Sequence, residues 1–376
     1  MRKIIYLFLI LVVIASAFSI CVLSANATTG KVGECTWQLD GTKLTISGEG
    51  SMGDDFSAPW GKEIRELVVE EGVTDIPRLM FDGCVNLRSI SFPSSLKTIG
   101  EAAFRGCSSL ASVEIPEGIV SIGDYAFGGC SLVYKVIISK TVTFIGKDSF
   151  SECYNLAHIV LDANNPSFKT VNGILFDKNM TELIKYPPNK AGSTYTVPDS
   201  VKKIGYKAFE KPYHLYFVNL PDDLTSIGAG AFTYTYMRYL PENQYEGGFY
   251  LGDYLILHND TSAESFSVRE GTKLIADAAF SGSMELKNIY IPDGVRYIGE
   301  YCFSWCEKLS EIYMPDSIIK VEKNAFDNCT SLKDIHYSGS KDDRSNIQID
   351  LYNSSLTSVE WIYNSLGKPR KLIPDL

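Results

Sequence analysis

The chain has 376 residues, with 35 lysine and arginine residues against 45 aspartate and glutamate residues, and its net charge at pH 7 is −10. An excess of negative charge repels phosphate backbones, which excludes nucleic acid as a partner. The length would suit two or three domains, unless internal repeats extend a single architecture instead.

The N-terminus has the pattern of an export signal. Arg2 and Lys3 precede an apolar run over residues 4–23, and small residues follow it. This order is typical of a cleaved secretory signal, which we place at residues 1–27. An uncleaved N-terminal anchor is the alternative, because the run approaches the roughly 20 residues that span a bilayer. Lipidation of Cys21 is a weaker alternative. We therefore expect a secreted or cell-surface protein with no other membrane segment.

Residues 28–62 are expected to form an N-terminal β cap. Residues 37–41 and 44–47 alternate apolar and polar side chains on either side of a glycine, which predicts a hairpin. The hairpin leads to Trp60. A repeat protein needs such a cap, because its terminal coil exposes both its core and a sheet edge.

A 23-residue repeat occupies most of the remaining chain. One complete unit is Leu87-x-x-Ile90-x-Phe92-Pro93-x-x-Leu96-x-x-Ile99-Gly100-x-x-Ala103-Phe104-x-x-Cys107. The phenylalanine recurs as Phe81, Phe104, Phe127, Phe150, Phe209, Phe232, Phe280, Phe303 and Phe326. The cysteine recurs as Cys84, Cys107, Cys130, Cys153, Cys306 and Cys329. Registers that keep one spacing over so many copies predict a structural repeat.

Each unit predicts one coil of a β-rich solenoid of leucine-rich type. The alternating apolar residues before the proline indicate a short half-buried strand, and the Ile-Gly pair begins a second extended piece. One coil buries too little apolar surface to offset the entropy of ordering it, so the coils must stack. We therefore expect a right-handed coil of short parallel strands joined by turns and 3-10 segments, with the repeated phenylalanines and cysteines in its core.

The repeat is interrupted twice. We place repeats at 63–161, 201–240 and 271–337, and insertions at 162–200 and 241–270. Each insertion holds two apolar runs around turn-forming residues, which predicts a β-hairpin that projects from a coil or lengthens it.

The C-terminal segment, residues 338–376, is expected to cap the other end. Four apolar residues within it would close the last coil: Leu351, Leu356, Val359 and Trp361. The coils around residues 201–240 should be irregular, because Pro212 and Thr235 stand where the repeat has cysteine.

The pattern Leu-x-x-Ile-x-x-Pro, followed by Ile-Gly-x-x-Ala-Phe-x-x-Cys, resembles the BspA-like, treponemal-type leucine-rich repeat family. The resemblance covers essentially the whole chain after the signal, and residues 44–52 and 335–339 are also similar to that family's end segments. It implies a secreted or surface protein of the kind found in anaerobic bacteria and some protists. Several such proteins are linked to adhesion to host matrix proteins, other bacteria or polysaccharide. The family pattern carries no catalytic residues.

The cysteines allow more than one interpretation. Equivalent cysteines of neighbouring coils would lie near the roughly 5 Å spacing of paired strands, which is within disulfide reach. Their side chains point the same way, however, so we favour stacked buried thiols. Cys302 and Cys306 are the one close pair, and Cys302 occupies a position that holds alanine elsewhere, so we expect no metal site. Cys35 has no partner that the sequence identifies.

No pattern predicts catalysis or a cofactor. The motif Gly48-x-Gly50-x-x-Gly53 fits a dinucleotide fingerprint, but no amphipathic helix follows it, so we interpret it as a turn of the cap. None of the four histidines lies in a metalloprotease or nucleophile motif. The paired aspartates at 54–55, 222–223 and 342–343 suit solvated turns, with weak calcium binding as the alternative.

One set of residues is placed as a binding surface would be. The residue between the two buried positions of each strand must face solvent, and the C-terminal coils place Tyr290, Tyr313 and His336 there. Exposed stacked aromatics suit sugar rings or an extended peptide, although they also stabilise a sheet as cross-strand pairs. The N-terminal coils instead hold Ser91, Glu114, Ile137 and Val160 at this position.

The sequence therefore predicts a non-catalytic, monomeric binding or adhesion module for an extracellular protein or polysaccharide, of host or bacterial origin. A carbohydrate-active enzyme is the alternative, and it would need two carboxylates in a groove near the hairpins. A structural spacer in an envelope is a further alternative.

Overall fold

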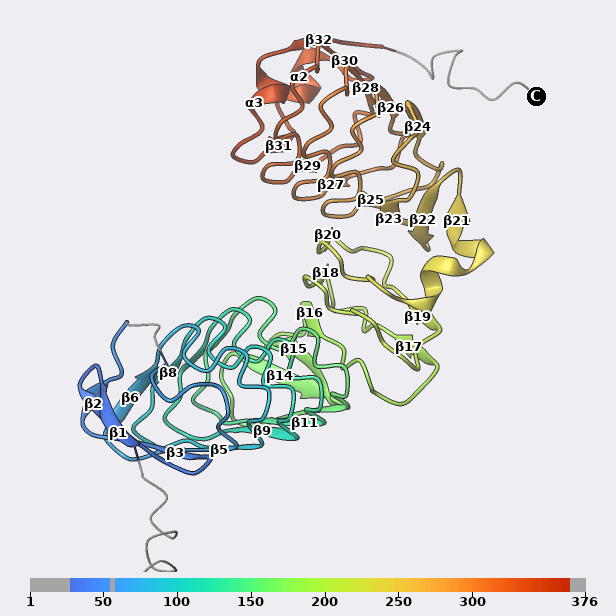
Figure 1. The fold of residues 1–376 in the computed structure, drawn as a ribbon. Helices are drawn as coiled ribbons and strands as arrows, with labels where there is room; N and C mark the ends of the chain where they lie inside the picture. The colour runs from blue at the N-terminus through green and yellow to red at the C-terminus, as the bar shows by residue number, and fades with distance from the viewer. Residues whose placement is uncertain (1–27, 55–57, 366–376) are drawn as a thin grey trace, which may run out of the picture. The chain divides into compact units, whose positions relative to one another are not determined.

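The computed structural model describes residues 28–54 and 58–365, which form two compact units that meet in sequence at Cys153 and Tyr154 (Figure 1). The predicted signal at 1–27 and the end of the predicted C-terminal cap lie outside the described residues. Among the described residues, no helix is long and apolar enough to cross a membrane. We describe unit 1, up to Cys153, and unit 2, from Tyr154, separately.

Unit 1 begins with an antiparallel meander that continues into parallel coils. The strands β1, β2 and β3 pair in antiparallel order, and β3 then pairs in parallel with β5 and β5 with β7. The strands β9 and β11 pair in parallel with a shift of one repeat, Ser112 opposite Lys135. The bounds are β1 Thr28–Val32, β2 Cys35–Asp40, β3 Lys43–Ser47, β5 Glu66–Val69, β7 Ser89–Ser91, β9 Ser112–Ile115 and β11 Lys135–Ile138.

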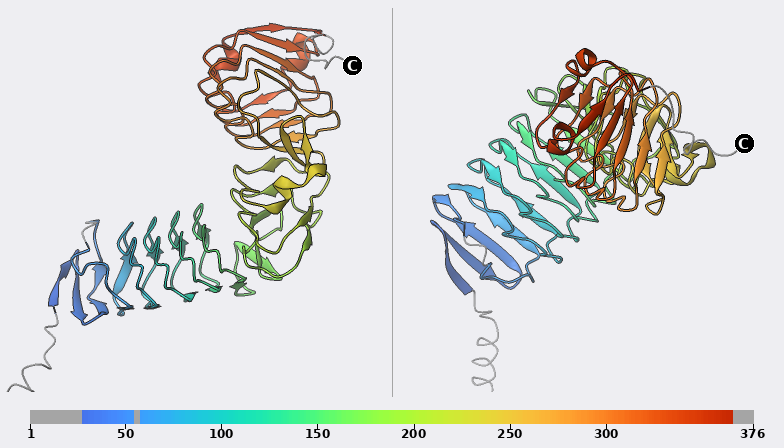
Figure 2. Two further views of the ribbon diagram at one scale, coloured as in Figure 1. Left: turned by 45° about the vertical axis from the view of Figure 1, so that its right-hand side comes forward. Right: turned by 90° about the horizontal axis from the view of Figure 1, so that it is seen from above.

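A second parallel sheet runs along the other side of the same coils, so each regular coil contributes one strand to each sheet (Figure 2). Its strands are β4 Gly50–Ser51, β6 Val73–Ile76, β8 Thr98–Ile99, β10 Ser121–Ile122 and β12 Phe144–Ile145. The strands β8, β10 and β12 end at the isoleucine of the Ile-Gly pair, and the chain then continues to the core phenylalanine.

In unit 2 the first predicted hairpin lengthens a coil. The strand β15 pairs in antiparallel order with both β14 and β16, and β16 continues in parallel with β18 and β20. The strands are β13 His158–Leu161, β14 Phe168–Val171, β15 Ile174–Asp177, β16 Glu182–Lys185, β17 Thr194–Thr196, β18 Lys203–Ile204, β19 Phe217–Asn219 and β20 Ser226–Ile227. The irregular coil expected near Thr235 is present as two 3-10 helices, η1 Tyr236–Tyr239 and η2 Pro241–Asn243.

The second hairpin joins the solenoid in the same way, because β23 pairs antiparallel with β22 and parallel with β25. One sheet then contains β21 Gln244–Tyr245, β22 Gly248–Leu251, β23 Tyr254–His258, β25 Leu274–Ile275, β27 Tyr297–Ile298, β29 Lys320–Val321 and β31 Gln348–Ile349. The other contains β24 Ser265–Ser267, β26 Asn288–Tyr290, β28 Glu311–Met314, β30 Asp334–Tyr337 and β32 Glu360–Ile362. The predicted class, a leucine-rich-type solenoid with two hairpin insertions and end caps, is thus the observed fold.

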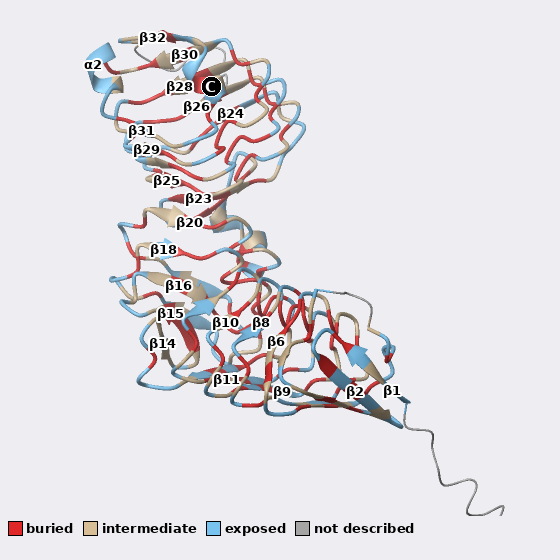
Figure 3. Ribbon diagram, turned by 90° about the vertical axis from the view of Figure 1, so that its left-hand side faces the viewer, coloured by how far each residue is buried: buried red, intermediate tan, exposed pale blue. Residues whose placement is uncertain are grey.

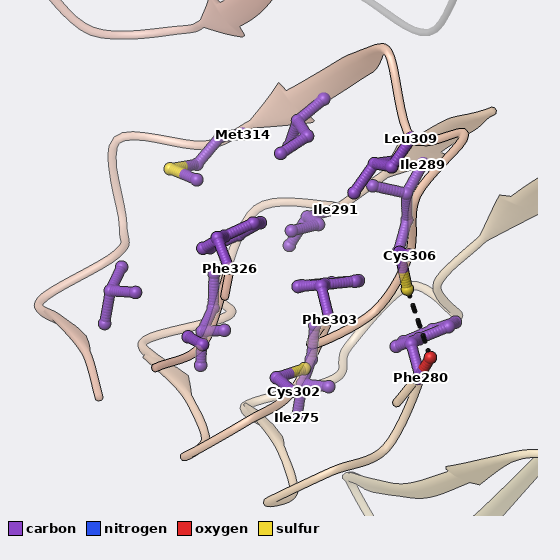
Figure 4. Packing of buried hydrophobic residues seen from close by; sticks show 14 of the residues in the cluster. Ile275, Phe280, Ile289, Ile291, Cys302, Phe303, Cys306, Leu309, Met314 and Phe326 are labelled. Atoms are coloured by element: carbon purple, nitrogen blue, oxygen red, sulfur yellow. Dashed lines mark hydrogen bonds between the residues drawn. The ribbon is translucent and has the colours of Figure 1, made fainter. Parts of the chain in front are cut away.

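The repeated phenylalanines stack in columns, one inside unit 1 and two inside unit 2. Ring centroids are 5.1 Å apart between Phe81 and Phe104 and 5.3 Å apart between Phe104 and Phe127, and the rings are nearly parallel. In unit 2, the ring centroid of Phe303 lies 5.0 Å from that of Phe280 and 4.9 Å from that of Phe326. Figure 4 shows these three rings among the buried residues of the unit. Buried residues follow the inner side of the coils in Figure 3. Stacking supplies the apolar contacts that a single coil lacks.

A different ring begins each column. Trp60 stacks on Phe81 at 5.5 Å, Tyr186 on Phe209 at 5.2 Å, and His258 lies 5.0 Å from Phe280. Tyr186 follows the first inserted hairpin directly and His258 ends the second, so each hairpin supplies the ring that covers the next column. The sequence did not predict these three roles.

The described cysteines are buried, and six of their thiols donate to a backbone carbonyl. All eight cysteines of the described residues are buried and lie outside disulfides. The Sγ of Cys107 donates to the carbonyl of Phe81 at 3.3 Å, and the Sγ of Cys306 donates to that of Phe280 at 3.2 Å. Burial raises the pKa of the Cys306 thiol to about 12. Cys35, whose partner was open, is buried in the cap with its Sγ 3.7 Å from the Gly50 carbonyl.

The C-terminal cap differs from expectation at one residue. Leu356 and Trp361 are buried as predicted, but Leu351 is 73% exposed, so its predicted role in the cap is wrong. The buried Asn353 covers this part of the last coil instead: its Oδ1 accepts from the Phe326 N–H, and its Nδ2 donates to the Glu322 carbonyl at 2.8 Å. Two short helices complete the cap, α2 Lys341–Arg344 and α3 Ser354–Thr357.

Candidate binding surface

The sheet of β24, β26, β28, β30 and β32 has an inner and an outer face. Side chains alternate along each strand, so the middle residue packs inward: Phe266, Ile289, Ile312, Ile335 and Trp361 are all buried. Because the strands are parallel and in register, equivalent outward residues form straight columns across the coils. Equivalent side chains therefore recur on the outer face once per coil, at the spacing of paired strands.

Tyr290, Tyr313 and His336 form one such column, which we call the aromatic column. Tyr290 lies opposite Tyr313, and Tyr313 lies opposite His336. The rings of Tyr313 and His336 are 4.4 Å apart and within 5° of parallel. All three side chains are half-buried, since their neighbours on the sheet cover their sides. The predicted residues are thus adjacent, in an ordered and only partly exposed row.

Two columns of carboxylates border the aromatic column, and sequence reasoning missed both. The first acidic column is Glu311, Asp334 and Glu360, in direct register across β28, β30 and β32. The second acidic column is Glu270, Asp293 and Asp316, which occupy the same position of three successive coils and are exposed. The signal was available, because 270, 293 and 316 are one repeat apart, as are 311 and 334.

The carboxylates lie close enough to act on the tyrosines electrostatically. The Tyr313 hydroxyl donates to Glu311 Oε2 at 3.2 Å. Burial, together with the negative charge of Glu311 and Asp334, raises the pKa of Tyr313. Burial and the charges of Glu270 and Asp293 raise the pKa of Tyr290. Both rings therefore remain neutral phenols at physiological pH, within a negative potential.

The carboxylates near the second hairpin do not form an open acid–base pair. Asp222 and Asp253 line one shallow pocket together with Asn219 and Tyr254. The Lys273 Nζ lies 3.7 Å from Asp222 Oδ1 and 3.1 Å from Asp253 Oδ2. A glycosidase needs one of its two carboxyl groups to carry the proton, whereas here an ammonium lies between them. This arrangement suits a surface ion-pair cluster.

A second group of exposed aromatics lies on the irregular coils of unit 2. The rings of Tyr216 and Tyr236 meet edge to face at 5.2 Å, and Tyr239 is 72% exposed. The Lys211 Nζ lies 4.1 Å from the centre of the Tyr154 ring. Tyr216 and Tyr239 are one repeat apart, but Tyr236 and Tyr239 lie in the 3-10 helix η1, so these rings are not aligned by strand pairing as the aromatic column is.

The repeats match a known family of repeat proteins. A family model described as a BspA-type leucine-rich repeat region matches residues 59–182, 189–242 and 254–365 in 6 copies. No curated protein matches the chain.

The chain is similar to solved leucine-rich repeat proteins of bacteria. A protein of Eubacterium ventriosum is similar with a TM-score of 0.53 and 23% identity, over 84% of this chain and 86% of that one. A leucine-rich cell surface protein of Faecalibacterium prausnitzii has 24% identity and a TM-score of 0.38, over 87% and 99% of the two chains. The pneumococcal vaccine antigen PcpA has 18% identity and a TM-score of 0.43, over 90% and 99%.

Proposed function

Because the chain belongs to the BspA-type leucine-rich repeat family, we propose that it is a non-catalytic module that binds an extracellular macromolecule through the aromatic column of unit 2. The observation that carries the proposal is the in-register row of Tyr290, Tyr313 and His336, with the last two rings stacked at 4.4 Å. The partner is a protein or a polysaccharide outside the cell, of host or bacterial origin.

The aromatic column has the physical properties of a contact surface. Neighbouring strands fix the rings, so a partner would not have to immobilise them on binding, and binding loses less entropy. Tyrosine offers a broad apolar ring with a polar hydroxyl, a combination that is common where proteins bind other molecules. A long regular sheet also contacts an extended partner at several coils at once.

We further propose that the protein acts outside the cytoplasm, after export through the signal at residues 1–27. The similar protein of Faecalibacterium prausnitzii is described as a cell surface protein. The thiol chemistry is compatible with this location. All eight described cysteines are buried, so an oxidising environment would not reach their sulfurs. Fractionation of the native organism tests this: the protein should be recovered from the medium or the cell surface, and recovery from the cytoplasm alone would contradict it.

An array of glycans and matrix proteins, probed with residues 28–376, tests the binding function. The wild-type protein should bind at least one class of ligand, and Tyr290→Ala and Tyr313→Ala should each weaken that binding. The matched control is Tyr239→Ala, which removes a more exposed tyrosine from a different surface of the same unit. If the two column variants bind as the wild type does, or if Tyr239→Ala weakens binding as much as they do, the proposed surface is wrong.

A further inference from the structure

We propose that the aromatic column and the two acidic columns together bind a cationic, extended polypeptide segment of another macromolecule. This inference rests on the binding function proposed above and names the chemistry of the partner. The binding face consists of Tyr290, Tyr313 and His336 with the carboxylates Glu311, Asp334 and Glu360 on one side and Glu270, Asp293 and Asp316 on the other.

The acidic columns differ in ion pairing from some other carboxylates of unit 2. Elsewhere in unit 2, carboxylates of neighbouring coils pair with lysines: Glu264 with Lys287 at 2.8 Å, and Glu285 with Lys308 at 2.7 Å. None of the six carboxylates of the two acidic columns makes an ion pair with a lysine or arginine of the described residues. Some acids of the unit are thus neutralised by a lysine of a neighbouring coil, whereas these six are not.

The first acidic column places like charges next to one another on the sheet. In the first acidic column, Glu311 lies directly opposite Asp334 and Asp334 directly opposite Glu360. Like charges in directly opposed positions of a sheet destabilise it. The fold does not require a carboxylate at this position of the coil, because the equivalent residue of β26 is the neutral Asn288. A cationic partner would turn the repulsion into attraction.

The spacing of the three columns favours an extended partner with several positive charges. A lysine or arginine side chain can lie over the face of a tyrosine ring, where the ring quadrupole attracts it, and its charged end then reaches a carboxylate on either side. The carboxylates recur over three successive coils at about 4.8 Å per strand, so a single cation would use only part of the face. A chain with several basic residues would use all of it, whereas an acidic polysaccharide would be repelled.

Calorimetric titration of residues 28–376 tests the inference with three probes. They are a decapeptide of alternating lysine and serine, the same peptide with glutamate in place of lysine, and cellohexaose as a neutral glycan. We expect binding of the lysine peptide only. That binding should weaken as salt rises from about 0.1 M to about 1 M, which shortens the Debye length from about 10 Å to about 3 Å.

Two triple variants with the same change in charge separate a local site from general attraction. Glu311→Gln, Asp334→Asn and Glu360→Gln together should weaken binding of the lysine peptide about tenfold or more, which corresponds to about 1.4 kcal/mol. The control is Asp199→Asn, Glu242→Gln and Glu300→Gln, which lie on unit 2 outside the sheet of β24 to β32. It should change the affinity by less than about twofold, because exposed charges beyond a Debye length are screened. A thermal melt of each variant verifies that it is folded.

The outcomes distinguish this inference from the proposed function. Equal weakening by both triple variants, or no binding of the lysine peptide by the wild type, would overturn the inference. If cellohexaose or an array ligand binds in a way that depends on Tyr290 and Tyr313 while the lysine peptide does not bind, the proposed function stands and the cationic partner is wrong. If no ligand depends on either the tyrosines or the carboxylates, both proposals fail.

Discussion

The same coil presents different columns of side chains in the two units. In unit 1, the residues equivalent to the first acidic column are Lys43, Glu66, Ser89, Ser112 and Lys135. Two of them form an ion pair, with the Lys43 Nζ 3.1 Å from Glu66 Oε1. The position of the second acidic column holds Glu71, Ser94, Glu117 and Lys140. There Ser94 donates to Glu71, and Lys140 pairs with Glu117 at 2.8 Å.

The aromatic position shows the same contrast. In unit 1 it holds Val68, Ser91, Glu114 and Ile137, whereas unit 2 has two tyrosines and a histidine in succession. Unit 1 thus uses its outer face to neutralise charge between coils, and unit 2 leaves like charges together around aromatic rings. Because the interior columns are alike, the difference does not arise from the needs of the fold. Functional surfaces commonly give up stability in this way.

The largest effect on stability should come from the interior columns of phenylalanine, which are present in both units. We expect Phe104→Ala in unit 1 and Phe303→Ala in unit 2 each to lower the free energy of unfolding by about 3–5 kcal/mol, because each leaves a cavity between two stacked rings. Denaturant unfolding followed by fluorescence measures the loss. Phe144→Ala is the control, because this ring is 53% exposed. A cost for Phe104→Ala no larger than that of the control would show that the column does not stabilise unit 1.

A smaller effect on stability should come from the rings that begin the columns, because one of them, His258, can take up a proton. His258 in unit 2 is buried, its Nδ1 lies 3.0 Å from Ser283 Oγ, and its Nε2 has no hydrogen-bond partner among the described residues. Burial lowers the pKa of His258, although Asp260 opposes the shift, and the rings of Phe266 and Phe280 cover the imidazole. The neutral form is therefore the one that the fold favours.

We therefore expect the stability of unit 2, and not that of unit 1, to depend on pH in this way. A histidine whose pKa is lowered by folding adds its full stability above the unfolded pKa of about 6.5, and this stability is lost as the pH falls through that value toward the folded pKa. Thermal melts between pH 8 and pH 5, a range of about three units around that pKa, should show the loss in the wild type. The loss should be reduced in His258→Phe. An unchanged pH profile in the variant would contradict this role of His258.

The outer columns should respond to neutralisation with opposite signs. Asp334→Asn should raise the stability of unit 2 by about 0.2–1 kcal/mol, because it removes like-charge repulsion with both Glu311 and Glu360. Lys43→Gln in unit 1 should lower stability by no more than about 1 kcal/mol, because its ion pair with Glu66 is exposed. Melting temperatures at low and high salt measure both effects, and shifts of the same sign would remove the contrast between the two faces.

An effect of similar size is expected at a turn that departs from its own repeat. The same corner of the coils in unit 1 holds Gly83, Gly106, Gly129 and then Glu152, whose φ is 55°. Non-glycine residues are strained in this left-handed region, so Glu152→Gly should stabilise unit 1 by about 0.5–1 kcal/mol. Gly129→Glu, the reverse change in the neighbouring coil, should destabilise it by a similar amount. Two changes of the same sign would mean that the backbone conformation does not decide the effect.

The repeat made much of the structure predictable from the sequence. A fixed spacing of phenylalanine and cysteine indicated the stacked interior, the strand alternation indicated the aromatic column, and the longer spacings indicated the hairpins. The acidic columns were missed although Glu270, Asp293 and Asp316 obey the same spacing, since charged residues in turns do not stand out individually. The exposure of Leu351 could not be predicted, because hydrogen bonds of Asn353 to distant residues decide how the last coil is covered.

Carboxyl footprinting tests most directly whether the outer face of unit 2 is the working surface. Carbodiimide-driven labelling with an amine, read by mass spectrometry, is performed with and without the lysine–serine decapeptide. We predict that the peptide protects Glu311, Asp334, Glu360, Glu270, Asp293 and Asp316, while the labelling of Glu66, Glu114 and Glu117 in unit 1 is unchanged. Equal protection of both sets, or protection of the unit 1 residues alone, would contradict the account.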